Sequence, residues 1–513
     1  MRYFGVMKKV LFLKNLQKPI IFVLLITFLY TSVFSFLSIR RIHILWASYF
    51  DMGIMHQTVY NTFESLRHVD ITRILELTDP HGSGNQIKRM AIHNDVILAF
   101  VAPLYYIYSG PETLAVAQTI VLASGAIALY LIVRKRTINW KLENKYLSII
   151  LSWLLPCIYL LYTPLQKSNL YEFHAVTLAT SLILWMYYFY LKRYWKVFSI
   201  FIILTLLTKE QIGFSLAIFL LVESVKYLRP LFKPNQKVIS INNILHNRSV
   251  RLLVTGSFIC LLYVWFTVFF FMPSFRGWDK HFALDYFAKD TSSPIQFIYS
   301  HISQLFSFET IKYILLIIGP LALLPFGSIY ILPAIPEILI NLLSSSPQMK
   351  SMYFHYTAAI TPWLFIATID TLIRLLPRLN RGIVKVILII LIFTSIGFSI
   401  LESPLPYSFT NQNILWTEVV PDRRDILLWQ QILDRDDIRV SSTGQFAPYL
   451  TSRRYFYDFG INYPKADYVV IRKKEIFEYP DNAKLIPFYN QLLVDPSFKI
   501  IYSNNDTEVY KRQ

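Results

Sequence analysis

Long apolar runs recur along most of this chain, and short basic segments separate them. A run of about 20 apolar residues can cross the ~30 Å hydrocarbon core of a membrane as a helix. The residues are 54% hydrophobic and only 16% charged, whereas about a quarter of a soluble domain is charged. We therefore predict a mainly α-helical, multi-pass membrane bundle with about 11–12 membrane helices. The runs fall near residues 19–39, 96–109, 112–133, 146–163, 175–191, 195–208, 211–228, 252–272, 311–330, 331–343, 355–375 and 383–401.

The formal net charge of +18 arises from 50 Lys and Arg residues against 32 Asp and Glu residues. In a soluble protein this surplus would suggest nucleic acid, but here the basic residues gather in loops between apolar runs. Such loops stay in the cytoplasm. We expect no nucleic-acid partner, a cytoplasmic N-terminus and an extracytoplasmic C-terminal segment in the cell membrane. The basic clusters lie within residues 2–18, 134–145, 192–196, 229–251 and 374–385.

One apolar run, residues 96–109, does not fit this orientation as a full crossing. The N-terminus and the loop 134–145 are both predicted to be cytoplasmic, which leaves room for one crossing between residues 96 and 133. The run is short for a membrane span and contains Pro103. We predict a partial or strongly tilted helix in the outer leaflet.

The composition changes after residue 401, where a charged and turn-rich segment begins. Alternation of apolar and polar residues predicts strands in this segment, and one stretch has a helical pattern. We predict a transmembrane domain over residues 1–401 and a small extracytoplasmic α/β domain over residues 402–513. The expected helix covers Asp425 to Leu433, and the expected strands cover Ile438 to Ser442, Arg454 to Phe459, Asp467 to Arg472, Phe498 to Tyr502 and Glu508 to Lys511.

The predicted first outer loop, residues 40–95, is long enough to suggest a function. Near its start, Asp51 stands among apolar and aromatic residues. Partial desolvation would raise the pKa of this carboxylate toward that of a working base. The alternative is that Asp51 caps the N-terminus of a short interfacial helix, a common place for Asp before an apolar run, and spacing alone favours the cap.

Two further polar groups stand at the predicted outer ends of helices. The sequence His93-Asn94-Asp95 precedes an apolar run and, taken alone, is more typical of a helix cap than of a ligand set. Glu172 and His174 are two residues apart, so their side chains point the same way only on an extended segment. They either line a cavity or lie at the water interface. Two such ligands do not establish a metal site, and a divalent metal stays open.

The pair Lys209-Glu210 interrupts an apolar stretch, and charged residues within membrane segments are functional candidates. Lys209 suits an anionic group, although a salt-bridged turn between two helices is an equal alternative. Pro333 and Pro336 indicate a broken or re-entrant helix, which membranes tolerate where the backbone lines a cavity. We predict that Glu337 and His355 face that cavity. Gln57 and Glu210 complete the set of predicted cavity-lining residues.

Six segments that contain the candidate residues occur in an order that resembles a large, functionally uncharacterised family of bacterial and archaeal polytopic membrane proteins. That family looks like a branch of the GT-C glycosyltransferases, which take a sugar from a polyprenyl-phosphate donor. The segments are FDMGIMHQ (50–57), HNDVILAFVAPLY (93–105), NLYEFH (169–174), TKEQIG (208–213), PAIPEILINLLS (333–344) and HYTAAITP (355–362).

The resemblance implies a catalytic acid in the first outer loop, where Asp51 stands, and a second acidic residue, for which Glu172 is the nearest match. Asp51 would act as the general base on an acceptor hydroxyl. The phosphate of the departing donor needs cations, and the candidates are Lys209, His174, His93 and His355. His174 stands where the family pattern has a second acid, so metal dependence stays open.

Two other functions compete with glycosyl transfer. A transporter or flippase for a lipid-linked glycan would favour charged or broken helices near the middle of the membrane and two related halves. Here the polar clusters gather at the predicted outer ends, and the sequence has no matching halves. The second alternative is a non-catalytic membrane protein of envelope assembly whose tail binds a partner. The sequence leaves the sugar, the acceptor and the oligomeric state undetermined.

Overall fold

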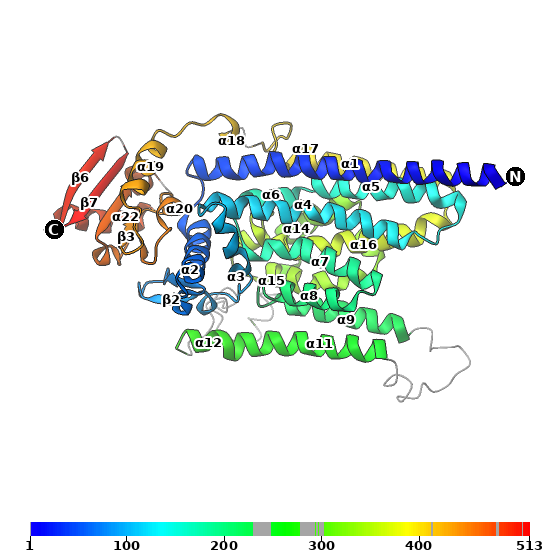
Figure 1. Cartoon of the computed structure of the whole chain (residues 1–513), viewed down its shortest axis with the longest axis horizontal. Coiled ribbons are helices and arrows are strands. Elements are labelled where there is room, and N and C mark those ends of the chain that lie inside the picture. The colour runs from blue at the N-terminus through cyan, green and yellow to red at the C-terminus, as the bar shows by residue number, and fades with distance from the viewer. Residues whose placement is uncertain are drawn as a thin grey trace.

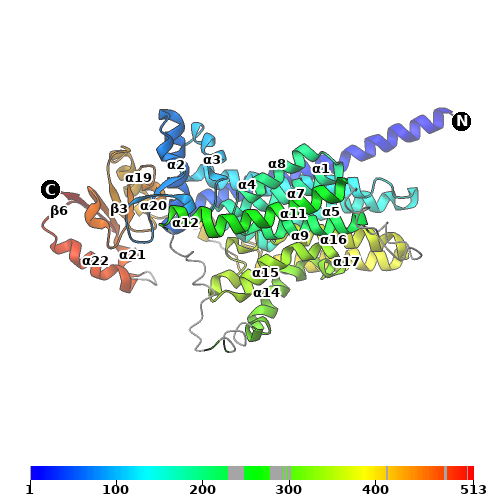
Figure 2. The ribbon, with the colours of Figure 1, turned by 90° about the horizontal axis from the view of Figure 1, so that it is seen from below.

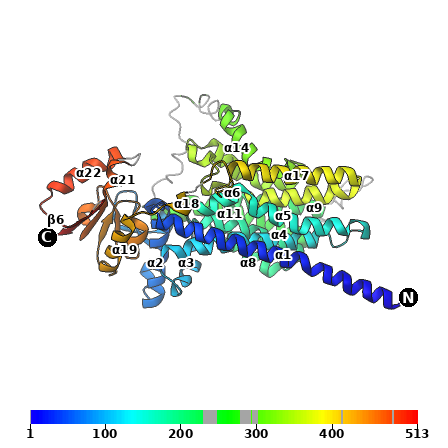
Figure 3. The same cartoon turned by 90° about the horizontal axis from the view of Figure 1, so that it is seen from above.

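The computed structural model of this chain describes residues 2–228, 248–277, 293, 296, 302–411, 414–478, 482–504 and 506–513. Long helices lie side by side along the molecule, and a five-stranded sheet lies at one end of them (Figure 1). The N-terminus lies at the opposite end of the bundle, and the views from below and above show the same arrangement (Figure 2 and Figure 3).

Most helices of the bundle lie in the predicted apolar runs, whereas α6 and α12 were not predicted. Among the described residues, five helices are long and apolar enough to cross a membrane: α1 (its apolar part, Pro19–His43), α4, α5, α11 with its continuation, and α17. The other described bundle helices do not meet both the length and the apolarity of a membrane span, so the total of about 11–12 membrane helices stays a prediction. The helices are α1 (Arg2–His43), α4 (Pro111–Arg136), α5 (Lys145–Leu161), α6 (Thr163–Tyr171), α7 (Ala175–Lys192), α8 (Trp195–Leu206), α9 (Ile212–Leu228), α11 (Arg248–Phe266), α12 (Met272–Phe275), α14 (Phe308–Ile318), α15 (Ile335–Leu343), α16 (Thr361–Leu375) and α17 (Arg381–Glu402).

The predicted break before residue 343 is confirmed. Short 3-10 turns replace a continuous helix between α14 and α15, and each of these turns contains a proline. Proline lacks the N–H that an α-helix needs and clashes with the preceding turn, so it interrupts a long span. The turns are η9 (Gly319–Leu321), η10 (Leu324–Gly327) and η11 (Ile329–Ala334), and further 3-10 turns are η5 (Leu142–Asn144), η12 (Pro347–Lys350), η13 (His355–Thr357) and η14 (Leu376–Arg378).

The run 96–109 forms only two short helical pieces, α3 (Leu98–Val101) and η4 (Ala102–Tyr106). The prediction of a partial helix there is confirmed. Because residues 96–109 do not form a long helix, α1 and α4 are the long helices on either side of the first loop. Helix α1 runs toward the sheet end and α4 runs in the opposite direction, so the loop after α4 lies at the same end of the bundle as the N-terminus (Figure 1). Of the basic cluster 229–251, residues 229–247 lie outside the described residues.

The first loop at the sheet end is folded, which the sequence did not predict. A π-helical turn opens it and continues directly into a helix, and a small antiparallel hairpin follows, in which Thr78 pairs with Gln86. The elements are η1 (Tyr49–Gly53), α2 (Ile54–His68), η2 (Ile71–Arg73), β1 (Glu76–Thr78), β2 (Gln86–Lys88) and η3 (Arg89–Ala91).

The chain after α17 contains all five predicted strands, in the order β4-β3-β5-β7-β6. Strands β4, β3 and β5 are parallel, and β7 pairs antiparallel with β5 and β6. The predicted helix is α19, whereas α20, α21 and α22 were not predicted. The elements are α18 (Ile414–Thr417), α19 (Asp422–Ile432), β3 (Val440–Ser442), α20 (Ala447–Leu450), β4 (Phe456–Asp458), η15 (Tyr463–Lys465), β5 (Tyr468–Arg472), α21 (Lys473–Phe477), α22 (Asn482–Val494), β6 (Phe498–Asn504) and β7 (Thr507–Arg512).

The sheet shares one hydrophobic core with the first loop. Phe456 and Val509 of the sheet belong to the same buried cluster as Tyr49 and Met52 of η1. The Tyr49 and Phe456 rings lie 4.9 Å apart between centroids. Burying one such apolar side chain stabilises a fold by about 1.5–3 kcal/mol, so these contacts hold η1 in place. The other face of the sheet packs in a separate cluster that includes Tyr457.

Candidate active site

Asp51 lies in η1 and contacts two side chains from the segment between α6 and α7. Its Oδ1 lies 2.9 Å from Nε2 of His174, and the Tyr171 hydroxyl donates a hydrogen bond to its Oδ2. Its side chain is 23% exposed. The carboxylate makes no capping hydrogen bond, because η1 runs straight into α2 and leaves no free helix start at residue 51. The cap interpretation of Asp51 is therefore wrong.

The pKa of Asp51 lies below its ordinary value, which corrects the expectation of a raised pKa. Burial of the carboxylate raises the pKa, but the positive charge and hydrogen bond of His174 and the hydrogen bond of Tyr171 lower it by more. Asp51 is therefore ionised at neutral pH.

Glu172 contacts the backbone of η1 rather than the side chain of Asp51. Its Oε2 accepts hydrogen bonds from the backbone N–H groups of Met52 at 2.7 Å and Ser48 at 3.3 Å. Its side chain is only 3% exposed. Burial, reinforced by the nearby charge of Asp51, raises the pKa of Glu172 to about 8, although Arg41 partly offsets this. The contacts of Glu172 fix the backbone that carries Asp51.

The segment that carries Glu172 and His174 is extended, as the spacing required. The backbone angles are φ −165° and ψ 170° at Glu172, and φ −137° and ψ 133° at His174. Both side chains consequently point toward η1, one to its backbone and one to Asp51. Both side chains are buried, so they do not lie at the water interface.

Gln118 of α4 holds the same segment from the other side. Its Nε2 donates to the carbonyl oxygens of Asn169 and Glu172, both at 3.1 Å, and its Oε1 accepts from the N–H of His174 at 3.0 Å. Sequence reasoning missed Gln118. The available signal was an uncharged polar residue inside a long apolar run, which in a membrane helix usually has a partner.

Arg41, near the end of α1, was also missed. Its Nη1 donates to the Tyr353 hydroxyl at 3.0 Å, and its Nη2 lies 4.0 Å from Oε1 of Glu172. The guanidinium also lies 5.5 Å from the ring centroid of Tyr171 and 5.9 Å from that of Trp46. The signal was the pair Arg40-Arg41 at the predicted outer end of the first helix, where basic residues are not expected.

His355 and His174 form an imidazole stack, with ring centroids 3.7 Å apart and an interplanar angle of 21°. Nδ1 of His355 is buried and has no hydrogen-bond partner among the described residues. Burial, together with the positive charges of His174, Lys209 and His93, holds the pKa of His355 well below its ordinary value. These four basic side chains thus lie close enough to act on one another.

His93 and Glu210 form an ion pair, with Nδ1 of His93 2.9 Å from Oε1 of Glu210. Glu210 also accepts the backbone N–H of Asn94 at 3.1 Å, and Asp95 pairs with Arg89 at 2.6 Å. No side chain of residues 93–95 caps α3, so the cap interpretation of this motif is wrong. The polar groups of residues 93–95 instead form ion pairs and hydrogen bonds with Glu210 and Arg89.

Lys209 lies in the turn between α8 and α9 and is half-buried. Its charge acts on both His355 and Glu337, which places these residues near one another. Gln211 hydrogen-bonds Glu337, whose Oε1 is buried without a partner in the part of the chain that the structure describes. Unpaired buried polar atoms are costly, so those of Glu337 and His355 point to a polar ligand.

Gln57 lies apart from this group. Its Nε2 donates to Oγ1 of Thr78 at 3.2 Å and to the carbonyl oxygen of Arg454 at 3.0 Å, and its Oε1 accepts from the N–H of Thr78 at 3.3 Å. The side chain is fully buried. Gln57 connects α2 to β1 and to the segment before β4, and the structure does not bring it together with the other candidates.

The carboxylates of the site do not form a metal-binding set. Asp51 faces His174 and Tyr171, while Glu172 faces backbone N–H groups and Arg41. Within the described ranges, no three His, Cys, Asp or Glu side chains are grouped so that they could hold a metal ion. This donor arrangement therefore does not fit a divalent cation.

Comparisons with known proteins give one family and several distant structural likenesses. No curated protein sequence matches the chain significantly. Among solved structures, ArnT from Cupriavidus metallidurans bound to undecaprenyl phosphate is similar with a TM-score of 0.48 and 12% identity, covering 95% of this chain and 97% of that one. The Archaeoglobus fulgidus oligosaccharyltransferase in the apo form is similar with a TM-score of 0.34 and 13% identity, covering 95% of this chain and 74% of that one.

The family comparison covers most of the sequence. Residues 41–508 match the family described as "Predicted membrane protein (DUF2079)". The match begins at the end of the first helix and extends into the last strand, so it includes every candidate residue from Asp51 to His355. This chain is therefore a membrane protein that belongs to the DUF2079 family.

Proposed function

We propose that this protein is a membrane glycosyltransferase that transfers a sugar from a polyprenyl-phosphate donor to an extracytoplasmic acceptor. The observation that carries the proposal is the position of Asp51. Its ionised, partly exposed carboxylate contacts His174, which stacks on His355. The charges of Lys209 and His93 act on His355, and the turn that carries Asp51 lies at the sheet end of the apolar helical bundle. A lipid-linked sugar phosphate combines the features that such a site fits: an apolar tail, an anionic linkage and a reactive sugar carbon.

Asp51 is the proposed general base. It takes the proton of an acceptor hydroxyl as that oxygen attacks the anomeric carbon of the donor sugar, most simply with inversion. The new carbon–oxygen bond forms while the bond from the anomeric carbon to the phosphate oxygen breaks. The polyprenyl phosphate leaves with the electron pair of that bond, and the proton stays on Asp51.

The departing phosphate gains negative charge, and a fixed positive charge together with fixed hydrogen-bond donors stabilises it. Lys209, His174, His93 and His355 are the proposed donors, and a hydrogen bond to a charged group contributes about 1.5–3 kcal/mol. The unpaired Nδ1 of His355 supports this role, because a phosphate oxygen would give it the partner that it lacks among the described residues. Glu210 contacts His93, and the charge of Lys209 acts on Glu337, so both carboxylates belong to the surroundings of these donors.

Glu172 is the proposed positioning residue of the site. It was predicted as a second catalytic acid, but its hydrogen bonds go to the backbone of η1, and its side chain is almost fully buried. It therefore acts through Asp51, by keeping the π-helical turn at a fixed distance from His174.

The orientation follows from the basic loops. The Lys and Arg residues gather in the segments that follow α4, α7, α9 and α16 in the sequence, and such basic segments belong in the cytoplasm. We accordingly infer that the end carrying Asp51 and the sheet is extracytoplasmic. We also propose a division into a transmembrane domain, residues 1–401, and an extracytoplasmic domain, residues 402–513. The two domains share a hydrophobic core around η1.

The decisive variant is Asp51→Asn in purified protein reconstituted into liposomes with radiolabelled polyprenyl-phosphate hexoses and pentoses. General-base catalysis contributes about 10²–10⁴-fold, so transfer should fall by that factor while insertion and thermal unfolding stay unchanged. Asp437→Asn, at an exposed ion pair with Arg435, is the matched control and should transfer normally.

The same liposomes distinguish the alternatives. Normal transfer by Asp51→Asn would overturn the proposed base. Movement of the labelled lipid across the bilayer without transfer would favour a flippase, and neither activity would favour a non-catalytic envelope protein.

A further inference from the structure

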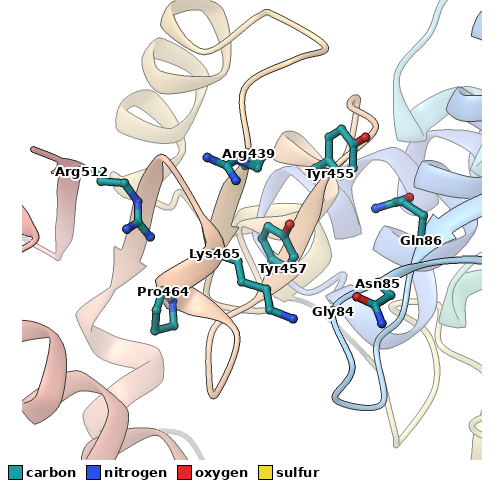
Figure 4. Close-up of a pocket in the computed structure, with 9 residues that line it drawn as sticks. All are labelled: Gly84, Asn85, Gln86, Arg439, Tyr455, Tyr457, Pro464, Lys465 and Arg512. Carbon is teal, nitrogen blue, oxygen red and sulfur yellow. The ribbon is translucent and has the colours of Figure 1, made fainter.

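A second polar cleft lies between the hairpin of the first loop and the sheet, on the face of the sheet away from Asp51. Its volume is about 440 Å³. Asn85 and Gln86 line it from the hairpin side, and basic and aromatic side chains line it from the sheet side (Figure 4). The sheet residues in this lining are Arg439, Tyr455, Tyr457, Pro464, Lys465 and Arg512.

Direct contacts hold the two walls of this cleft together. Nζ of Lys465 donates to the carbonyl oxygen of Ser83 at 2.6 Å, and Nδ2 of Asn462 donates to that of Gly82 at 3.0 Å. Gly84 at the hairpin tip has a φ of +61°, and a Cβ there would lie 2.8 Å from the side chain of Asn462. A side chain at position 84 would be strained by this φ and would displace the Asn462 side chain, so the hairpin tip fits closely against the other wall.

The cleft carries an excess of positive charge. Arg439 is paired with Asp467, at 2.7 Å between Nη2 and Oδ1. Lys465 and Arg512 donate instead to the backbone carbonyls of Ser83 and Ala466. Asp467 is near enough to feel the charge of Arg512 as well, so one carboxylate faces two guanidinium groups, and the lining keeps a positive excess. Ammonium and guanidinium groups fixed in this way bind carboxylate and phosphate groups.

Two tyrosines come from one face of strand β4. Tyr455 and Tyr457 are two residues apart and line the cleft, while Phe456 between them packs on Tyr49 of η1. Strand β4 is the edge strand of the sheet, and it separates the cleft from the turn that carries Asp51. Tyrosine combines an apolar ring with a hydroxyl, which suits the faces and hydroxyl groups of sugars.

We propose that this cleft binds an anionic saccharide, that is, a sugar chain with carboxylate or phosphate substituents. The ring of Tyr455 contacts the sugar rings, Tyr457 forms the floor of the cleft, the amides of Asn85 and Gln86 bind hydroxyl groups, and Lys465 and Arg512 bind the anionic substituents. The further statement that this saccharide is part of the acceptor rests on the proposed function. Binding in the cleft does not rest on it.

Calorimetry with the full-length protein in detergent tests the proposal, with trigalacturonate as the anionic probe and maltotriose as the neutral one. Trigalacturonate should bind saturably and at least about tenfold more tightly than maltotriose. The double variant Lys465→Gln/Arg512→Gln should lose about tenfold or more in affinity, since it removes two charge-assisted contacts. Lys499→Gln on β6, which is exposed and outside the cleft, should bind like the wild type.

A second variant covers the risk that the double variant disturbs the hairpin. Tyr455→Ala leaves both cations in place and should weaken trigalacturonate binding about threefold or more, with unchanged thermal unfolding. Equal binding of the two probes, or unchanged affinity in both variants, would overturn the proposal. So would cleft-dependent binding to phosphatidylglycerol vesicles with none to trigalacturonate.

Asp51→Asn separates this inference from the proposed function. It should bind trigalacturonate like the wild type although it lacks transfer activity. If the wild-type protein binds trigalacturonate through the cleft but transfers no sugar, the binding site stands and the proposed function fails.

Discussion

The imidazole of His355 stacks on the imidazole of His174, 3.7 Å away, and His174 in turn contacts Asp51 at 2.9 Å. Three elements that are far apart in the sequence thus meet at the proposed base: η1, the segment before α7, and η13. The stack fixes the plane of His174, and the plane of His174 fixes the direction from which Asp51 is approached. His355 can therefore influence the reaction in two ways, through the stack and through its unpaired Nδ1.

The variant His355→Phe separates these two ways. Phenylalanine keeps a flat ring against His174 but removes Nδ1, so a role in phosphate binding predicts a fall in kcat/KM of about tenfold or more, with little change in thermal unfolding. His355→Asn, which restores a donor, should recover part of the loss. Full activity of His355→Phe would limit His355 to packing.

The hydrogen bond from Tyr171 to Asp51 predicts a pH effect. This bond lowers the pKa of Asp51, and a base acts only when it is deprotonated, so the wild-type acid limb of kcat/KM should lie at low pH. In Tyr171→Phe the pKa of Asp51 rises, and the acid limb should move to higher pH. Transfer assays between pH 4 and 8 measure this shift. If the acid limb of kcat/KM lies at the same pH in Tyr171→Phe as in the wild type, a group other than Asp51 causes it.

His56 predicts an acid sensitivity of folding. It is fully buried, with Nδ1 2.6 Å from the Tyr105 hydroxyl and Nε2 2.8 Å from Oγ of Ser452, and burial lowers its pKa to about 4. A lowered histidine pKa means that the unfolded chain binds the proton more readily. The stabilisation is complete above about pH 6.5 and is lost as the pH falls toward 4, by about 3 kcal/mol in all.

Unfolding of the wild type and of His56→Gln, measured in detergent from pH 4 to 7.5, checks this difference. The wild type should lose more stability on acidification than the variant does. Parallel curves for the two proteins would contradict the assignment to His56.

A buried ion pair at the other end of the bundle predicts non-additive stability. Nη2 of Arg136 on α4 lies 2.7 Å from Oδ1 of Asp370 on α16, and Asp370 also accepts from Ser328 at 2.7 Å. Asp370→Leu should cost about 3–5 kcal/mol, because it leaves a largely buried guanidinium without this partner. The double variant Arg136→Met/Asp370→Leu should recover about 1–3 kcal/mol of that loss, and strict additivity in unfolding measurements would contradict this coupling.

Much of the helical fold was predictable, because a membrane leaves few choices for apolar runs of this length. The runs that became α4, α7 and α17 matched the structure within a few residues. The strands were predictable from alternation. Helix α22 was missed because Pro487 inside it reads as a break, and the three-residue strands β1 and β2 are too short to leave a pattern.

The site was predictable as a set of residues but not as a set of contacts. Asp51, Lys209 and His355 stood out because charged or titratable groups among apolar residues are costly and usually have a role. Sequence spacing cannot show that Gln118 and Arg41 support them, since these partners come from different helices. The misplacement of Gln57 has the same origin, because its partners lie in β1 and near β4.

The core that η1 shares with the sheet bears on how the protein is made. Val509, in the last strand, belongs to the cluster that also contains Tyr49 and Met52. A ribosome produces residue 51 long before it produces residue 509. The turn that carries Asp51 therefore lacks its contacts with the sheet until synthesis of the last strand is complete. An interrupted or truncated chain would insert its helices yet lack the packing that sets its carboxylate. The packing around the turn that carries Asp51 therefore depends on the last strand of the chain.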